Sequence, residues 1–296
     1  MANLRDVRLR MKAIGQTLQV TKAMNLISTS KLRRGRHLLQ DTEPFFNRIQ
    51  KTMTNVLNSI SSVNSMYFKH GDKGHTGIIV VTSDKGLAGG YNANVARYAS
   101  QLCEKVDNPA LVFIGNVGHR YFDNSPYLIL EDFSFQGQLP TVEEAQAVSE
   151  WVIAQFLWGV FKEVKIVYTH MYSTLKLVPQ ERMVLPLNRE TMQQIKTELS
   201  PFSSETQQEK INIEYIPSAD VVLDTLAPIY TRGVIYGCLV EAYASEQSAR
   251  MSAMDEASRN GEDMLAKKQL LYNRVRQTSI TQEVTEIVSG SAALMD

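Results

Sequence analysis

The spacing of apolar residues predicts a long helix at the N-terminal end of the chain. A strict heptad laid from Leu4 to Val63 has thirteen apolar residues at its eighteen positions. Its five polar or small positions lie in the central part and are Thr21, Asn25, Ser28, Gly35 and Thr42. A seam that repeats every seven residues is typical of a helix that packs along a partner helix. From Ala2 to Val63 such a helix would be on the order of 90 Å long, and we expect a bend, not a break, at Pro44.

The C-terminal end predicts a second long helix that can pair with the first. No proline occurs from residue 229 to 289, and Ser218 or Asp220 can cap the start of the helix. From Ser218 to Ser289 a continuous helix would span about 108 Å, and Pro228 allows a kink in its first turns. Two helices from opposite ends of the chain can meet only if the segment between them brings the chain back. We therefore predict an antiparallel coiled coil with an α/β domain inserted at one end.

The middle of the chain alternates short apolar runs with helical stretches, which is typical of an α/β domain. Strands are predicted at 77–82, 110–114, 127–131, 163–169 and 182–187. A helix follows the first strand to about residue 106, and a capping box of Thr141 and Glu144 opens another helix that runs through Phe161. Successive strand-helix-strand units predict a largely parallel, Rossmann-like sheet. The predicted domains are an N-terminal coiled-coil helix over 1–65, the Rossmann-like domain over 76–200 and a C-terminal coiled-coil helix over 218–296.

Charge is balanced over the whole chain but not along it. The chain has 31 Lys plus Arg and 31 Asp plus Glu, and this net charge of zero argues against a chain-wide basic surface for nucleic acid. Between Arg5 and Arg36, however, nine basic residues accompany one acidic residue, Asp6. This local excess indicates acidic partners. We favour proteins over nucleic acid, because no aromatic platform or base-reading motif accompanies the charge.

Two features bear on where the protein is found. No stretch reaches the roughly 20 apolar residues that cross a bilayer. The first residues, Met1 to Asp6, lead directly into a charged helical pattern, without the features of a secretory signal. We expect a cytoplasmic location.

The sequence offers no catalytic, cofactor-binding or metal-binding constellation. The glycine-rich stretch from Ser83 to Asn92 follows a predicted strand, where a phosphate could bind, but it fits neither the dinucleotide nor the P-loop spacing. It is more typical of a tight strand-to-helix turn, which could also be a docking surface. The five histidines lack metal-ligand spacing, and Cys103 and Cys238 lie far apart in apolar surroundings, which favours buried, reduced thiols. We expect no cofactor and no metal.

Three blocks of the sequence resemble the gamma subunit family of F-type ATP synthases. The first, from Ile14 to Arg34, contains Val-Thr-Lys-Ala-Met-Asn at 20–25 and Ser-Lys-Leu-Arg-Arg at 30–34. The second is the glycine-rich stretch, and the third runs from Ser245 to Val288 and includes Ile-Thr-Gln-Glu at 280–283. Because the blocks lie in both predicted helices and in the inserted domain, the resemblance covers nearly the whole chain. The short N-terminus fits a bacterial-type member better than an organellar precursor. The cysteine-bearing insertion of chloroplast members is missing, so we expect no thiol control.

The resemblance implies a central-stalk rotor that transmits ion-driven rotation of a membrane c-ring to the catalytic beta subunits, which synthesise or hydrolyse ATP. The implied partners are the alpha and beta subunits of the catalytic ring, the epsilon subunit and the c-ring, with one copy of the chain per complex. The implied place is the cytoplasmic face of the cell membrane, as a peripheral protein. The residues alone also permit a coiled-coil scaffold, or a nucleotide-dependent enzyme that uses Gly86 to Gly90.

The same resemblance nominates individual partner-binding residues. Lys22 and Met24 match the N-terminal motif that faces the acidic lever region of the catalytic subunit. Arg276, Gln277 and Thr281 match the C-terminal motif that engages the loops of that subunit. Each of these residues could instead be a solvated or a coiled-coil position.

Two further segments are matched by the resemblance. Residues Val284 to Leu294 would form an apolar tip held in a bearing, although Ile287 and Val288 could instead pack on the N-terminal helix. Tyr215, just before Pro217, matches the segment that faces the c-ring. The family often has an acidic residue immediately before that proline, whereas Ile216 stands here and offers no ionic contact.

Overall fold

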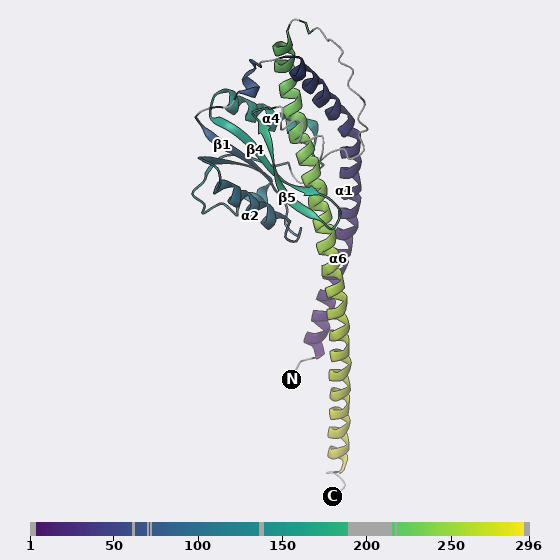
Figure 1. The fold of residues 1–296 in the computed structure, drawn as a ribbon. Coiled ribbons are helices and arrows are strands. Elements are labelled where there is room, and N and C mark those ends of the chain that lie inside the picture. The colour runs from purple at the N-terminus through teal and green to yellow at the C-terminus, as the bar shows by residue number, and fades with distance from the viewer. Residues whose placement is uncertain are drawn as a thin grey trace. The chain divides into compact units, whose positions relative to one another are not determined.

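The structure, a computed structural model, describes residues 4–60, 63–69, 71, 73–135, 139–188, 215–216 and 218–292 (Figure 1). The chain divides into two compact units, one formed by Met1–Ser28 with Arg250–Asp296 and the other by Thr29–Ala249. Two long helices, α1 (Leu4–Ser59) and α6 (Ala219–Ala292), contribute to both units. Helix α1 continues through Pro44 without a break, as the sequence predicts.

The helices α1 and α6 pair in the unit formed by the two ends of the chain. Asn25 Nδ2 donates a hydrogen bond to the carbonyl oxygen of Met251 at 3.0 Å. One turn earlier on α1, the Thr21 hydroxyl accepts a hydrogen bond from Ser258 Oγ at 3.0 Å. Residue numbers fall along α1 as they rise along α6, so the two helices are antiparallel. This confirms the predicted coiled-coil arrangement.

Glycines let the same two helices approach closely in the unit Thr29–Ala249. A Cβ atom added to Gly35 would lie 3.2 Å from the ring of Tyr243, and one added to Gly233 would lie 2.2 Å from the ring of Phe46. The ring of Phe46 therefore occupies the space that a side chain at position 233 would need. Here, too, the contacts run in antiparallel order.

The face of α1 that packs is the predicted heptad seam. Every seam position from Leu4 to Ile60 is buried or partly buried, including the five polar or small ones. Two of those, Thr21 and Asn25, use their side chains to hydrogen-bond across to α6. A polar residue in a helix seam is tolerated when its hydrogen bonds are made within the interface.

A five-stranded sheet lies in the unit Thr29–Ala249. Its strands are β1 (His75–Val81), β2 (Pro109–Ile114), β3 (Leu128–Phe133), β4 (Phe161–Met171) and β5 (Leu177–Leu185), arranged in the order β3-β2-β1-β4-β5. The pairs β1–β2, β1–β4 and β2–β3 are parallel, whereas β4–β5 is antiparallel. The predicted α/β class with a largely parallel, Rossmann-like sheet is confirmed.

Successive side chains along a strand point to opposite faces of the sheet, and they contribute to two hydrophobic cores, one on each face. In β1, Ile79 and Val81 join the core formed with α4 (Val142–Leu157) and the paired segments of α1 and α6. Ile78 and Val80 join the core formed with α2 (Tyr91–Cys103). The short helix α3 (Asn116–His119) and the 3₁₀ helix Met66–Phe68 complete the described elements.

Several boundaries differ from those predicted. Helix α4 begins with the predicted capping box, in which Thr141 and Glu144 exchange hydrogen bonds, but it ends at Leu157 and not at Phe161. The cause is Gly159, whose φ of +76° leaves the helical region, so that Phe161 can begin β4. Strand β5 begins at Leu177 instead of 182 and runs antiparallel, because the connection after β4 is too short for a crossover. The last part of the predicted domain 76–200 lies outside the described residues.

Among the described helices, none combines the length and the apolar character that a membrane crossing requires.

Candidate partner-binding surface

The C-terminal part of α6 extends past its contacts with α1 as a single helix (Figure 1). Leu271, Tyr272 and Val275 are the last large side chains of α6 that are partly buried. From Arg276 to Ser289 every residue except Ser279 is exposed. We call residues 276–289 the tip. A helix that presents all its sides to solvent is a surface for a partner, since most helical stability in proteins comes from packing.

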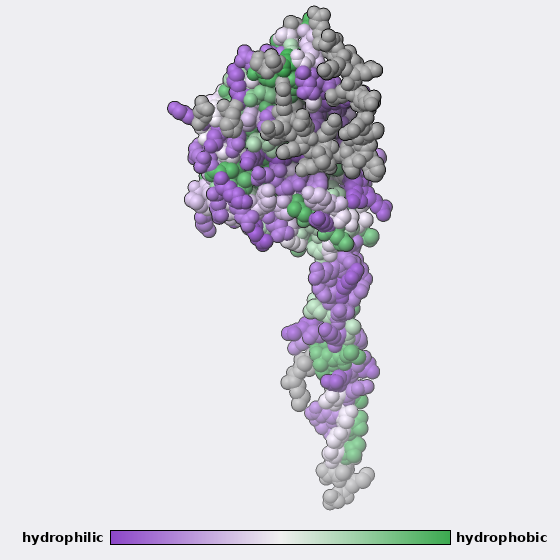
Figure 2. All heavy atoms as spheres, viewed as in Figure 1, coloured by the Kyte–Doolittle hydropathy of each residue, from purple (hydrophilic) through white to green (hydrophobic). Residues whose placement is uncertain are grey.

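Apolar side chains follow one side of the tip. They are Ile280, Val284, Ile287 and Val288, with exposed fractions between 50% and 71%. At i, i+4, i+7 and i+8 they share one helical face. Figure 2 shows hydrophobic residues along one side of this end of the helix. Of the two alternatives open for Ile287 and Val288, the exposure agrees with an apolar tip and not with burial against α1.

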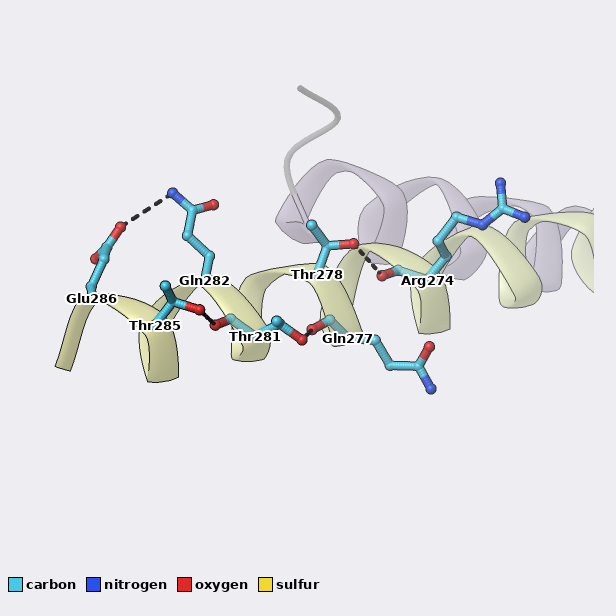
Figure 3. Close-up of a pocket in the computed structure, with 7 residues that line it drawn as sticks. All are labelled: Arg274, Gln277, Thr278, Thr281, Gln282, Thr285 and Glu286. Carbon is cyan, nitrogen blue, oxygen red and sulfur yellow. Dashed lines mark hydrogen bonds between the residues drawn. The ribbon is translucent and has the colours of Figure 1, made fainter. Parts of the chain in front are cut away.

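Polar side chains follow another side of this part of α6. They are Arg274, Thr278, Gln282, Thr285 and Glu286 (Figure 3). Hydrogen bonds link successive turns: Thr278 Oγ1 donates to the carbonyl of Arg274 at 3.1 Å, and Gln282 Nε2 donates to Glu286 at 3.2 Å. These contacts join side chains to their own helix, and the side chains remain exposed.

The three nominated residues of the tip lie beside the apolar stripe, and two of them, Gln277 and Thr281, also belong to the polar set. Arg276, Gln277 and Thr281 are all exposed, and Thr281 Oγ1 donates to the carbonyl of Gln277 at 2.9 Å. In Figure 3 the amide of Gln277 points to the other side of the helix from Gln282 and Glu286. The tip thus offers a guanidinium and an amide beside an apolar stripe, which is a combination suited to protein loops.

The two nominated residues of α1 lie elsewhere along the same unit. Lys22 Nζ lies 2.6 Å from Glu262 Oε1 of α6, and both side chains are more than half exposed, at 55% and 53%. Met24 is partly buried. Glu262, which marks the position of Lys22 along α6, precedes Arg276 by fourteen residues, or about 20 Å of helix. The nominated residues of α1 and those of the tip therefore lie at two separate positions along the helix pair.

The basic excess of α1 is a surface property. Eight of the nine basic residues between Arg5 and Arg36 are exposed, and Lys31 is partly buried. The single acidic residue in this stretch, Asp6, is also exposed, and Glu262 of α6 pairs with Lys22, so the exposed charged residues of the stretch itself are mostly basic.

Tyr215 belongs to the other unit and is partly buried against the core that contains α4 and the start of α6. Its neighbour Ile216 is 86% exposed. The position before Pro217 therefore presents an apolar side chain to solvent. Pro217 itself lies outside the described residues.

The glycine-rich stretch forms a closed turn between β1 and α2. Asn92 Oδ1 accepts a hydrogen bond from the backbone N–H of Ser83 at 2.9 Å, and Ser83 Oγ donates to the carbonyl of Lys85 at 2.7 Å. The cavity beside this turn measures about 50 Å³, against the roughly 300 Å³ or more of a typical ligand site. The geometry favours the tight turn over a nucleotide site.

The remaining side chains that could bind a metal or react are buried or lie apart. Within the described residues no three His, Cys, Asp or Glu side chains are placed to hold a metal ion. Cys103 and Cys238 are buried and form no disulfide, as predicted, and burial raises the pKa of the Cys103 thiol to about 11. A thiol with such a pKa is protonated at neutral pH and unreactive.

Sequence reasoning missed the partner of Lys22 and the polar side of the tip. The pairing of Lys22 with Glu262 depends on the register of two helices that lie 240 residues apart in sequence. The polar side could have been found from its spacing, because Arg274, Thr278 and Gln282 recur every four residues.

Comparison with known proteins finds relatives that match nearly the full length of this chain. A family model described as ATP synthase matches residues 3–294. The ATP synthase gamma chain of Acetivibrio thermocellus is 38% identical over 300 residues, covering 99% of this chain and 100% of that protein. The sodium ion specific ATP synthase gamma chain of Acetobacterium woodii is 33% identical over 303 residues, covering 99% of each chain.

Solved structures share the fold at lower identity. A chain of the OSCP/F1/c-ring structure of the Euglena gracilis mitochondrial ATP synthase, in rotational state 3, has a TM-score of 0.65 at 14% identity, with 98% of this chain and 94% of that chain covered. A chain of the central stalk and c-ring structure of the Tetrahymena thermophila mitochondrial ATP synthase has a TM-score of 0.57 at 22% identity, with 81% and 99% covered.

Proposed function

The chain belongs to the ATP synthase gamma-chain family and is a central-stalk rotor component, not a catalytic subunit; we propose that it transmits ion-driven rotation through its paired helices. Rotation of an asymmetric helix pair changes which residues face each catalytic subunit. Contacts that differ among the conformations of that subunit supply the free energy that shifts it from one conformation to the next. The chemistry of ATP belongs to the partner.

The observation that carries this proposal is the exposed tip of α6. Its apolar stripe and its polar side are both exposed in the unit formed by the chain ends. We assign the tip to contacts with the alpha and beta subunits of the catalytic ring, with Arg276, Gln277 and Thr281 meeting the loops of the beta subunit. Lys22 and Met24 supply a second level of contact, where the positive charge of α1 suits an acidic segment.

The unit Thr29–Ala249 is assigned to the membrane side. In this proposal Tyr215 and the exposed Ile216 meet the c-ring by apolar contact, and the Rossmann-like domain, 76–200, binds the epsilon subunit. The coiled-coil segments, 1–65 and 218–296, form the axle. One copy of the chain serves each complex, as a peripheral protein on the cytoplasmic face of the cell membrane.

Reconstitution tests the proposal. The purified chain is mixed with alpha and beta subunits, and steady ATP hydrolysis is measured. We expect a stable complex whose hydrolysis exceeds that of the alpha and beta subunits alone. A variant that ends at Val275 keeps the partly buried part of α6, lacks the tip, and should stimulate hydrolysis less. Absence of both complex and stimulation would leave the coiled-coil scaffold as the function.

Saturable binding of ATP by the isolated chain would argue instead for the glycine-rich turn as a nucleotide site. Calorimetry of the chain with ATP measures this directly, and we expect no heat of binding.

A further inference from the structure

Three polar side chains of α6 reach the end of strand β4 and the turn that follows it. Ser245 Oγ donates to the carbonyl oxygen of Thr169 at 2.8 Å, and Ser248 Oγ donates to the carbonyl oxygen of Thr174 at 2.9 Å. Glu241 completes the set. Since residues 241, 245 and 248 follow one another at i, i+4 and i+7, they occupy one face of the helix.

Glu241 is the acidic member of this set. Its carboxylate contacts Nδ1 of His170 and accepts a hydrogen bond from the backbone N–H of Met171 at 3.5 Å. The side chains of Glu241 and His170 are 7% and 14% exposed, so the pair is nearly shielded from water. The ring of Tyr172 lies edge-on to the imidazole, with ring centroids 4.4 Å apart.

The stability of the fold does not explain this buried pair. Taking a carboxylate out of water is costly, and well-packed apolar residues of similar size are often as stabilising as a buried ion pair. The neighbouring buried residues of α6 are of both kinds, with Val240, Ala242 and Ala244 apolar and Glu246, Gln247 and Arg250 polar. What the polar set adds is direction, because a hydrogen bond holds only over a narrow range of distances and angles.

The contacts fix α6 in two ways. They fall on successive points along one strand and its turn, from Thr169 to Thr174, so the helix cannot slide along the sheet without breaking them. They also come from a single helix face, so the helix cannot turn about its own axis. The set lies at the end of the unit Thr29–Ala249, where α6 continues beyond it.

We propose that Glu241, Ser245 and Ser248, with His170, are positioning residues that form a torsional clasp between the Rossmann-like domain and α6. This rests on the proposed function, since it assumes that rotation enters through that domain. The clasp keeps α6 from turning relative to the sheet, so that rotation of the domain becomes rotation of the helix that contacts the catalytic subunits.

The test uses the full complex in membranes and measures ATP-driven ion pumping relative to ATP hydrolysis. The clasp variants are Ser245→Ala with Ser248→Ala, and Glu241→Ala. We expect each to lower the pumping per ATP hydrolysed by roughly threefold or more. The matched control is Ser149→Ala, because Ser149 is equally buried but its hydroxyl bonds within its own helix, to the carbonyl of Gln146.

A second variant separates position from stability. His170→Leu combined with Glu241→Met replaces the pair by apolar groups and should keep the unfolding midpoint of the purified chain while pumping still falls. Glu241→Gln, which keeps an acceptor oxygen, should restore part of the pumping. Hydrogen exchange at the Met171 amide should quicken in Glu241→Ala and stay unchanged in Ser149→Ala.

The outcomes are distinct. Clasp variants that pump like the unmodified complex, or a His170→Leu/Glu241→Met chain that pumps normally, would overturn the clasp. So would an equal loss in Ser149→Ala. If the unmodified chain itself fails to support pumping, it is the proposed function that fails.

Discussion

At the scale of single residues, two glycines of α6 that lie four positions apart have opposite surroundings. A Cβ atom at Gly233 would lie 2.2 Å from two ring atoms of Phe46, whereas one at Gly237 would meet nothing within 4 Å. Both residues lie inside a continuous helix, where glycine costs conformational entropy. Close approach to α1 therefore explains the first glycine and not the second.

This contrast makes a matched prediction. Gly233→Ala should lower the free energy of unfolding by about 1–3 kcal/mol, because the added methyl group overpacks the contact with Phe46. Gly237→Ala should raise it by about 0.5–1 kcal/mol through helix propensity. Urea denaturation of the two purified variants gives both values. Equal effects of the same sign would show that Phe46 does not set the helix distance.

Burial of Cys103 predicts its reactivity. Its pKa of about 11, raised from 9.0 mainly by desolvation, means that at pH 8 the thiolate is about 100-fold scarcer than for an unshifted cysteine. Alkylation of the folded chain should therefore be slow, and should become rapid in denaturant. Ser30→Cys, at an exposed position of α1, is the control that should react quickly in the folded state. Rapid labelling of Cys103 in the folded chain would contradict its burial.

At the scale of elements, long periodic features could be predicted from sequence, whereas the end of one helix and the direction of one strand could not. The heptad seam of α1 sums a weak preference over many positions, so its burial followed from the pattern alone. The direction of β5 could not be derived in this way, because it depends on the turn after β4, where the N–H of Tyr172 bonds to the carbonyl of Lys176 at 3.1 Å. The end of α4 depended on the conformation of one residue, Gly159.

The candidate surface shows the same division. Exposure of Arg276 and Gln277 agrees with the resemblance that nominated them, although no contact within the chain tests their role. The pairing of Lys22 with Glu262 needed the register of α1 on α6, which a single sequence does not contain. The role of a residue can be suggested by its own stretch of sequence, whereas the residue that it contacts on another helix cannot.

The tip gives a prediction at this scale. Replacing Arg276 and Gln277 together with Ala should leave the helix intact, since Ala is a strong helix former, but should remove a charge and an amide offered to the partner. We expect ATP-driven ion pumping per ATP to fall by roughly two- to tenfold, while nucleotide binding by the beta subunit stays largely unchanged. The control is Lys267→Ala with Gln269→Ala, which removes the same two kinds of group from exposed positions before the tip. Unchanged pumping in the first variant would contradict the assignment.

At the scale of the whole molecule, the function requires α1 and α6 to turn as one body and not to slide past each other. Their hydrogen bonds across the seam, from Asn25 to Met251 and from Ser258 to Thr21, are consistent with a fixed register. An exposed ion pair such as Lys22–Glu262 adds little to this register, because such pairs contribute only about 0–1 kcal/mol. A covalent bond across the seam therefore tests whether sliding is part of the mechanism.

Thr21 and Ser258 are the positions for that bond, since their side-chain oxygens lie 3.0 Å apart. With both changed to Cys, the sulfur atoms come within reach of a disulfide of about 2.05 Å. If the helix pair rotates as one axle, oxidation should cross-link the chain and leave ATP hydrolysis and ion pumping close to the reduced level. Thr21→Cys alone controls for oxidation elsewhere, because the native cysteines are buried. Loss of both activities on oxidation, recovered by reductant, would mean that α1 and α6 must move against each other, and the axle would not be rigid at this level.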